Sequence, residues 1–138
     1  MTLEQLQAAL HDHDEGVLRS GTHKPGREFC ALEFESKVRG RAWSDAPVTL
    51  PDLRPLNDGP WSSDRARTAG LLPVMVALWD WADWTPARRQ RWAARVALRT
   101  VQQIIAEMPG LPPSVVAQCQ SCVTLDEAEA AAEAAARA

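Results

Sequence analysis

The feature that most constrains the fold of this chain is a set of helix-start signals spread along its length. Thr2 followed by Gln5 has capping-box spacing, in which side chains satisfy the free amides of a first helical turn. The same spacing recurs from Thr124, and Thr85-Pro86 puts a proline just after a capping hydroxyl. Strands are disfavoured because the chain has no tyrosine, two phenylalanines and ten prolines. We therefore predict an all-α fold, a single compact orthogonal bundle of about five to seven helices.

Breaks rich in glycine and proline divide the predicted helices. Gly40 suits the left-handed turn that ends a helix, and Pro73 is expected either to kink a helix or to begin a new one. A further helix start is expected at residues 44–47, before a proline-rich stretch. We expect a helical core domain of residues 1–110 and a C-terminal helical extension of residues 111–138. The other predicted helices span residues 3–11, 27–39, 64–84, 85–108, 114–123 and 126–138.

Charge and hydropathy exclude several classes of protein. The net charge is −3, which gives no general attraction to nucleic acid or to an anionic membrane. The apolar run of residues 69–79 is far shorter than the roughly 20 residues that cross a bilayer. No basic and apolar leader marks the N-terminus. We expect a small acidic cytoplasmic protein with no membrane segment and with Cys30, Cys119 and Cys122 as thiols.

The chain lacks the common signatures of catalysis and nucleotide binding. The patterns G-x-x-x-x-G-K-S/T, G-x-G-x-x-G, H-E-x-x-H and G-x-S-x-G do not occur. This favours a non-enzymatic protein without deciding the matter, and we expect no cofactor.

Two motifs resemble parts of metal sites. In His11-Asp12-His13-Asp14, alternate residues of a helix lie about 200° apart and cannot chelate together, so we favour a solvated helix end over a site completed by His23. Cys119-Gln120-Ser121-Cys122 has redox and half-zinc spacing, but it follows no strand and lacks further ligands nearby. We expect no metal, and core packing of both cysteines beside Val115, Val116 and Val123.

The predicted helix of residues 85–108 carries the clearest surface signal. Four arginines fall within an arc of about 80°, with Trp92 beside them. The opposite side holds Ala93, Ala97, Val101, Ile104 and Met108, so the arginines should be exposed. The face could be solvated or internally paired, bind a protein, or bind nucleic acid. The arginines are Arg88, Arg91, Arg95 and Arg99.

Three tryptophans precede that helix. Trp81 and Trp84 share an apolar face, whereas Trp79 projects toward the side of Asp80 and Asp83. We name Trp79 as a further candidate for partner binding, with burial by tertiary neighbours as the alternative.

A series of short motifs runs from Gly21 to Asp58: G-T-H, Cys30-Ala31-Leu32-Glu33, Ser44-Asp45-Ala46-Pro47 and Leu56-Asn57-Asp58. Their order and spacing resemble a group of small helical proteins encoded by actinobacteria and their phages, with the pattern G-x-H, C-x-M-E, S-D-x-P and L-N-D. The sequence departs from the pattern at Leu32. The resemblance implies a shared fold and no particular reaction.

The polar residues of these motifs have a structural interpretation and a functional one. Glu33 lies on a largely apolar helix, so we expect it to be buried and bonded to the amides after Ser44-Asp45 or to Arg39 or Arg41. The alternative is a polar pocket that binds metal or performs acid-base chemistry. The polar set comprises His23, Cys30, Glu33, Ser44, Asp45, Asn57 and Asp58.

Together these observations favour a non-enzymatic protein-binding module, encoded by a phage or prophage, that modulates or inhibits a host system. The first alternative is a small metal-binding or enzymatic domain that uses the polar set. The second is nucleic-acid binding through residues 88–99, which the net charge disfavours. Self-association is left open.

Overall fold

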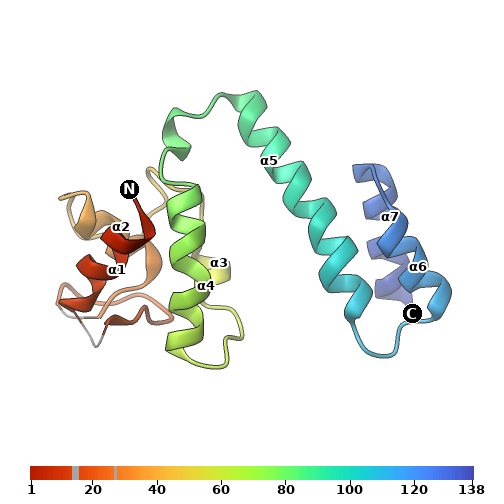
Figure 1. Cartoon of the computed structure of the whole chain (residues 1–138), viewed down its shortest axis with the longest axis horizontal. Coiled ribbons are helices and arrows are strands. Elements are labelled where there is room, and N and C mark those ends of the chain that lie inside the picture. The colour runs from red at the N-terminus through yellow and green to blue at the C-terminus, as the bar shows by residue number, and fades with distance from the viewer. Residues whose placement is uncertain (14–15, 27) are drawn as a thin grey trace. The chain divides into compact units, whose positions relative to one another are not determined.

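The computed structural model describes residues 1–13, 16–26 and 28–138. Within these ranges the protein has seven α-helices and no strand, which confirms the all-α prediction (Figure 1). No helix in the described part of the chain is long and apolar enough to cross a membrane. The chain forms two compact units, Met1–Asp83 and Trp84–Ala138, whereas we expected a boundary after residue 110.

The described residues of the N-terminal unit include four α-helices and a 3₁₀ turn near its end. Thr2 caps α1 through the predicted capping box with Gln5, and Ser63 caps α4. Pro73 lies inside α4, which continues past it to Ala77. The elements are α1 (Leu3–His11), α2 (Ala31–Val38), α3 (Arg54–Asn57), α4 (Asp64–Ala77) and the 3₁₀ turn Trp81–Asp83.

Helix α2 is the centre of this unit. Every residue from Ala31 to Ser36 is buried, including the side chains of Glu33 and Glu35. Phe29 and Phe34 pack edge to face at 6.0 Å between ring centroids, and Phe29 also contacts the Trp43 ring at 5.0 Å. Aromatic side chains that come before α2, within it and after it in the sequence therefore pack together.

Two predicted boundaries in this unit are wrong. Helix α2 begins at Ala31 instead of residue 27, because the backbone of Cys30 is extended and its amide is bonded to the Glu33 carboxylate. Residue 27 itself lies outside the described residues. No helix begins at residues 44–47, where the Ser44 hydroxyl accepts the Ala46 amide in a local turn. Gly40 ends the α2 segment with φ of 67°, as predicted.

The C-terminal unit begins with a long helical segment. Helix α5 (Pro86–Arg99) is capped by Thr85 as predicted, and it runs into a π-helical turn, Thr100–Ile104, and a 3₁₀ turn, Ile105–Glu107. Helices α6 (Pro113–Ser121) and α7 (Leu125–Arg137) follow, with the predicted capping box at Thr124. The core of this unit consists of Val101, Ala106, Cys119, Cys122, Ala128 and Ala131.

The π-helical turn affects which side chains pack in this core. The Ile105 amide bonds to the Thr100 carbonyl, one residue further back than in an α-helix. The prediction of the core side was wrong before the turn as well as after it. Ala93 and Ala97 of α5 are exposed, and no residue of α5 is buried. Beyond the turn, Ile104 and Met108 are 65% and 53% exposed. Leu98 and Ile105 pack against the core instead. The end of the segment packs against α6 and α7, and α5 belongs to the same compact unit, which begins at Trp84.

Candidate functional site

The polar set of the N-terminal unit centres on Glu33, whose side chain is fully buried as predicted. One carboxylate oxygen accepts the backbone amide of His23 at 2.6 Å. The other oxygen accepts the Cys30 amide at 2.8 Å and lies 2.9 Å from the His23 Nδ1. The carboxylate thus joins the loop that precedes α2 to the first turn of the helix.

The predicted donors to Glu33 are wrong. Arg39 and Arg41 instead form ion pairs with Glu35, a buried carboxylate two residues later, which also accepts the Thr49 hydroxyl. The spacing of Glu35 and Arg39, four residues apart on one helix, is the sequence signal that indicates this pair.

Asn57 is buried, and its side chain organises the next part of the set. Its Oδ1 accepts the Ala31 amide at 3.0 Å, and its Nδ2 donates to the Arg19 carbonyl at 2.9 Å and to Asp58 at 2.8 Å. The same Asp58 oxygen accepts the Gly21 amide at 2.7 Å. The L-N-D motif therefore ties α3 to the start of α2 and to the loop from Arg19 to Gly21.

Ser44 and Asp45 complete the set at its edge. The Ser44 carbonyl accepts the Ser36 hydroxyl at 3.0 Å, and Asp45 accepts the Thr22 hydroxyl at 2.8 Å. The loop is further fixed by Trp43, whose indole donates to the His23 carbonyl at 2.9 Å. Each motif from Gly21 to Asp58 thus contacts another, and their polar atoms bond mainly to backbone groups. This arrangement matches the structural interpretation of the set.

The chemistry of Cys30 points the same way. Its burial raises the pKa of the thiol to about 12, which keeps it protonated and a poor nucleophile near neutral pH. Among residues 1–13, 16–26 and 28–138, no group of three or more His, Cys, Asp or Glu side chains could hold a metal ion. The residues predicted in the His11 motif include Asp14, which lies outside the described residues.

Cys119 and Cys122 are free, buried thiols, as predicted. The Cys122 thiol donates to the Cys119 carbonyl at 3.1 Å, and both side chains belong to the core of the C-terminal unit. Val115 and Val116 pack against that core, but the expectation for Val123 is wrong, since it is 72% exposed beyond the end of α6. Ala128 and Ala131 of the alanine-rich α7 are buried there.

The second candidate site is the arginine face of α5, defined by Arg88, Arg91, Trp92, Arg95 and Arg99. All four arginines are exposed, as predicted, and Trp92 is half-buried. The Arg88 guanidinium lies 3.8 Å from the centre of the Trp84 ring. Within the described ranges, the guanidinium groups of Arg91, Arg95 and Arg99 have no ion-pair or hydrogen-bond partner.

Trp79 has a partner within its own unit. The Arg39 guanidinium lies 4.1 Å from the centre of the Trp79 ring, and its Nη2 donates to the Trp79 carbonyl at 2.6 Å. The Trp79 side chain is half-buried. One face of the ring is therefore already covered by Arg39.

Comparison with known protein families, curated proteins and solved structures finds no match for this chain.

Proposed function

We propose that this protein is a non-enzymatic binding module whose arginine face docks on an acidic surface of another protein. The observation that carries the proposal is that Arg91, Arg95 and Arg99 are exposed, with no partner among the described residues for their guanidinium groups. A guanidinium that already had a carboxylate partner would contribute little to a new interface, because the first pair would have to break. These three are ready to pair with carboxylates.

The distribution of charge in the C-terminal unit supports this proposal. No acidic residue occurs from Thr85 to Ile105, while all five acidic residues of the unit lie at Glu107 or beyond. The arginine face thus concentrates positive charge inside a chain whose net charge is −3. Such separation favours a complementary acidic partner and speeds the encounter with it.

Aromatic and apolar side chains beside the arginines supply the contact area that a salt bridge alone lacks. Trp92 lies next to the stripe, and Val96, one helical turn further along, is 43% exposed. Tryptophan and arginine are the residue types that most often carry binding energy at protein interfaces. We expect Trp92 to contribute more than any single arginine.

A nucleic acid is the competing partner for the same face, since arginines and a tryptophan can also hold phosphates and stack bases. We favour protein because the whole chain is acidic and because four arginines on one face of a helix give a narrow basic footprint. A modulator of a host system, encoded by a phage or prophage, is the biological role that we propose for such a module.

Site-specific photocrosslinking tests the proposal. A variant with a photoreactive residue in place of Val96 is incubated with lysate of the host cell at physiological salt and irradiated. A second variant carries it at Ala97, which is also exposed but lies on the other side of α5. We expect the variant with the photoreactive residue at position 96 to give one stoichiometric protein adduct, and the variant at position 97 not to give that adduct.

Charge variants decide whether the adduct reports on the arginine face. Arg91→Gln/Arg95→Gln should abolish the adduct, whereas Arg54→Gln/Arg137→Gln, which changes the net charge equally at two other exposed sites, should retain it. Equal yields from both variants would refute the proposal. A mobility shift with DNA or RNA at sub-micromolar concentration, lost in Arg91→Gln/Arg95→Gln, would replace the protein partner by a nucleic acid.

A further inference from the structure

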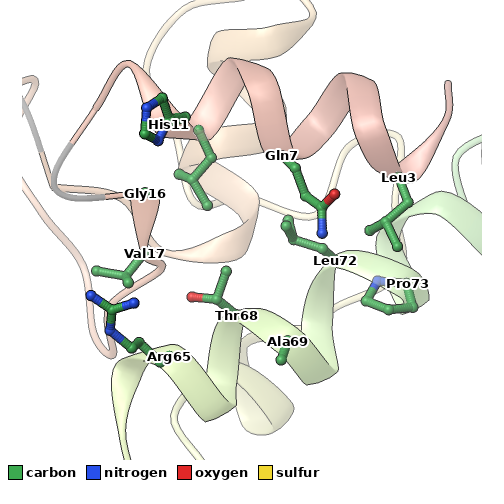
Figure 2. Close-up of a pocket in the computed structure, with 11 residues that line it drawn as sticks. Leu3, Gln7, His11, Gly16, Val17, Arg65, Thr68, Ala69, Leu72 and Pro73 are labelled. Carbon is green, nitrogen blue, oxygen red and sulfur yellow. The ribbon is translucent and has the colours of Figure 1, made fainter.

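A cavity of about 470 Å³ lies between α1 and α4 in the N-terminal unit (Figure 2). Its size falls within the range of about 300–1,000 Å³ that is typical of pockets for small molecules. Leu10, Val17 and Leu72 are buried and form its apolar floor. None of the residues that line it belongs to the polar set or to the arginine face.

The two ends of the cavity differ in chemistry. Figure 2 shows Leu3 and Pro73 at one end and His11, Gly16 and Arg65 at the other. An occupant that follows the cavity would therefore contact carbon at one end and a guanidinium and an imidazole at the other. This asymmetry fits an amphipathic molecule.

Three polar side chains at the cavity are available for a ligand. Within the described part of the chain, Gln7, His11 and Arg65 have no hydrogen-bond or ion-pair partner for their side chains. Figure 2 shows the Gln7 amide directed from α1 toward α4. Thr68 is not available in this way, because its hydroxyl already accepts the Leu18 amide at 2.8 Å and donates to the Asp64 carbonyl at 2.7 Å.

Charge selects the kind of ligand. Asp64, the residue before Arg65, is engaged by other cations, since its carboxylate pairs with Arg19 and with Arg67. Arg65 therefore presents an uncompensated guanidinium at the polar end among the described residues. A carboxylate would complement it, whereas an ammonium group would be repelled.

We propose that this cavity binds a small amphipathic carboxylate, with its apolar chain along Leu10 and Leu72 and its carboxylate at Arg65. The ligand class is a free medium-chain monocarboxylic acid or an aromatic acid of similar size. The site is separate from the arginine face, so either proposal can fail without the other.

Titration of the full chain with octanoate, followed by amide NMR shifts, tests this site. We expect saturable shifts in the first turns of α4 and along α1, and affinity that rises about fourfold for each added methylene from hexanoate to octanoate. Octylamine should give no saturable shifts, and octanol should bind more weakly than octanoate.

Two cavity variants and one control separate specific binding from surface adsorption. Arg65→Gln should weaken octanoate about tenfold and leave octanol unchanged. Ala69→Leu, which adds bulk at an exposed helical position lining the cavity, should weaken both ligands. Lys37→Gln makes the same charge change on α2 and should have no effect. Octanoate binding that is unchanged in Arg65→Gln, or that octylamine matches, would overturn the proposal, as would the absence of saturable shifts at millimolar octanoate.

Discussion

Replacing Glu33 by alanine tests the role that the structure gives to the polar set. The substitution removes the only carboxylate that holds the amides of His23 and Cys30, at 2.6 and 2.8 Å in the described structure. It also removes the partner of the His23 Nδ1. We expect the N-terminal unit to become markedly less stable while the C-terminal unit keeps its stability.

The magnitude follows from the number of donors left without a partner. Each buried donor that loses its acceptor costs about 1–3 kcal/mol, so the two amides together cost about 2–6 kcal/mol. The His23 imidazole adds less, because 14% of its side chain is exposed and can regain water. Water entering the vacated space reduces the loss, and we expect about 3 kcal/mol. Glu33→Gln, which keeps one acceptor oxygen, should lose about half as much.

Urea unfolding followed by indole NMR resonances measures each unit separately. Trp43 reports on the N-terminal unit through its bond to the His23 carbonyl, and Trp92 reports on the C-terminal unit. The matched control is Glu133→Ala, which removes an exposed carboxylate paired with Arg137 and should change stability by less than about 0.5 kcal/mol. A loss below about 1 kcal/mol in Glu33→Ala, or one equal to that of the control, would refute the reasoning.

Three further predictions address other parts of the molecule. Burial raises the pKa of Cys30 from 9.0 to about 12, so the unfolded state loses its thiol proton at a lower pH than the folded state. The free energy of unfolding should therefore fall by about 1.4 kcal/mol per pH unit as the pH rises above 9. Cys30→Ala should lack this component of the alkaline unfolding curve. Gly70→Ala would bring a Cβ within 2.4 Å of the Trp61 ring, whose indole nitrogen donates a hydrogen bond to the Leu56 carbonyl. The substitution should lower the free energy of unfolding by about 1–2 kcal/mol. A gain in stability with an unshifted Trp61 resonance would contradict this. Protein purified without chelator should contain well below one metal ion per chain by elemental analysis, and a chelator should leave its thermal unfolding unchanged.

Local rules predicted much of the fold because the signals involved lie within one helical turn. The caps at Thr2, Thr85 and Thr124 were predicted from adjacent residues and are present. Helical periodicity predicted the exposed arginine face correctly, but it also placed Ala93 and Ala97 on a core side, and both are exposed because no residue of α5 is buried.

Predictions that depended on distant partners failed. The burial of Glu33 was predictable from its apolar helix, but one of its donors lies ten residues earlier in the loop at His23, a contact that no local pattern specifies. The capping role of Cys30 follows from the same carboxylate. No sequence pattern specifies the π-helical turn at Thr100–Ile104. The turn shifts the helical register, so the side chains that follow it face other directions than an uninterrupted α-helix predicts.

The affinity of the arginine face for its partner is the measurement that tests the central claim most directly. The partner protein that is captured by crosslinking at position 96 is first purified. It is then titrated calorimetrically with the wild type, with Arg91→Gln/Arg95→Gln and with Arg54→Gln/Arg137→Gln, over a range of salt concentrations. We predict that the Arg91→Gln/Arg95→Gln variant binds at least about tenfold more weakly and with a smaller dependence on salt, because exposed charge pairs are screened by ions. Equal affinity and equal salt dependence in all three proteins would contradict the account.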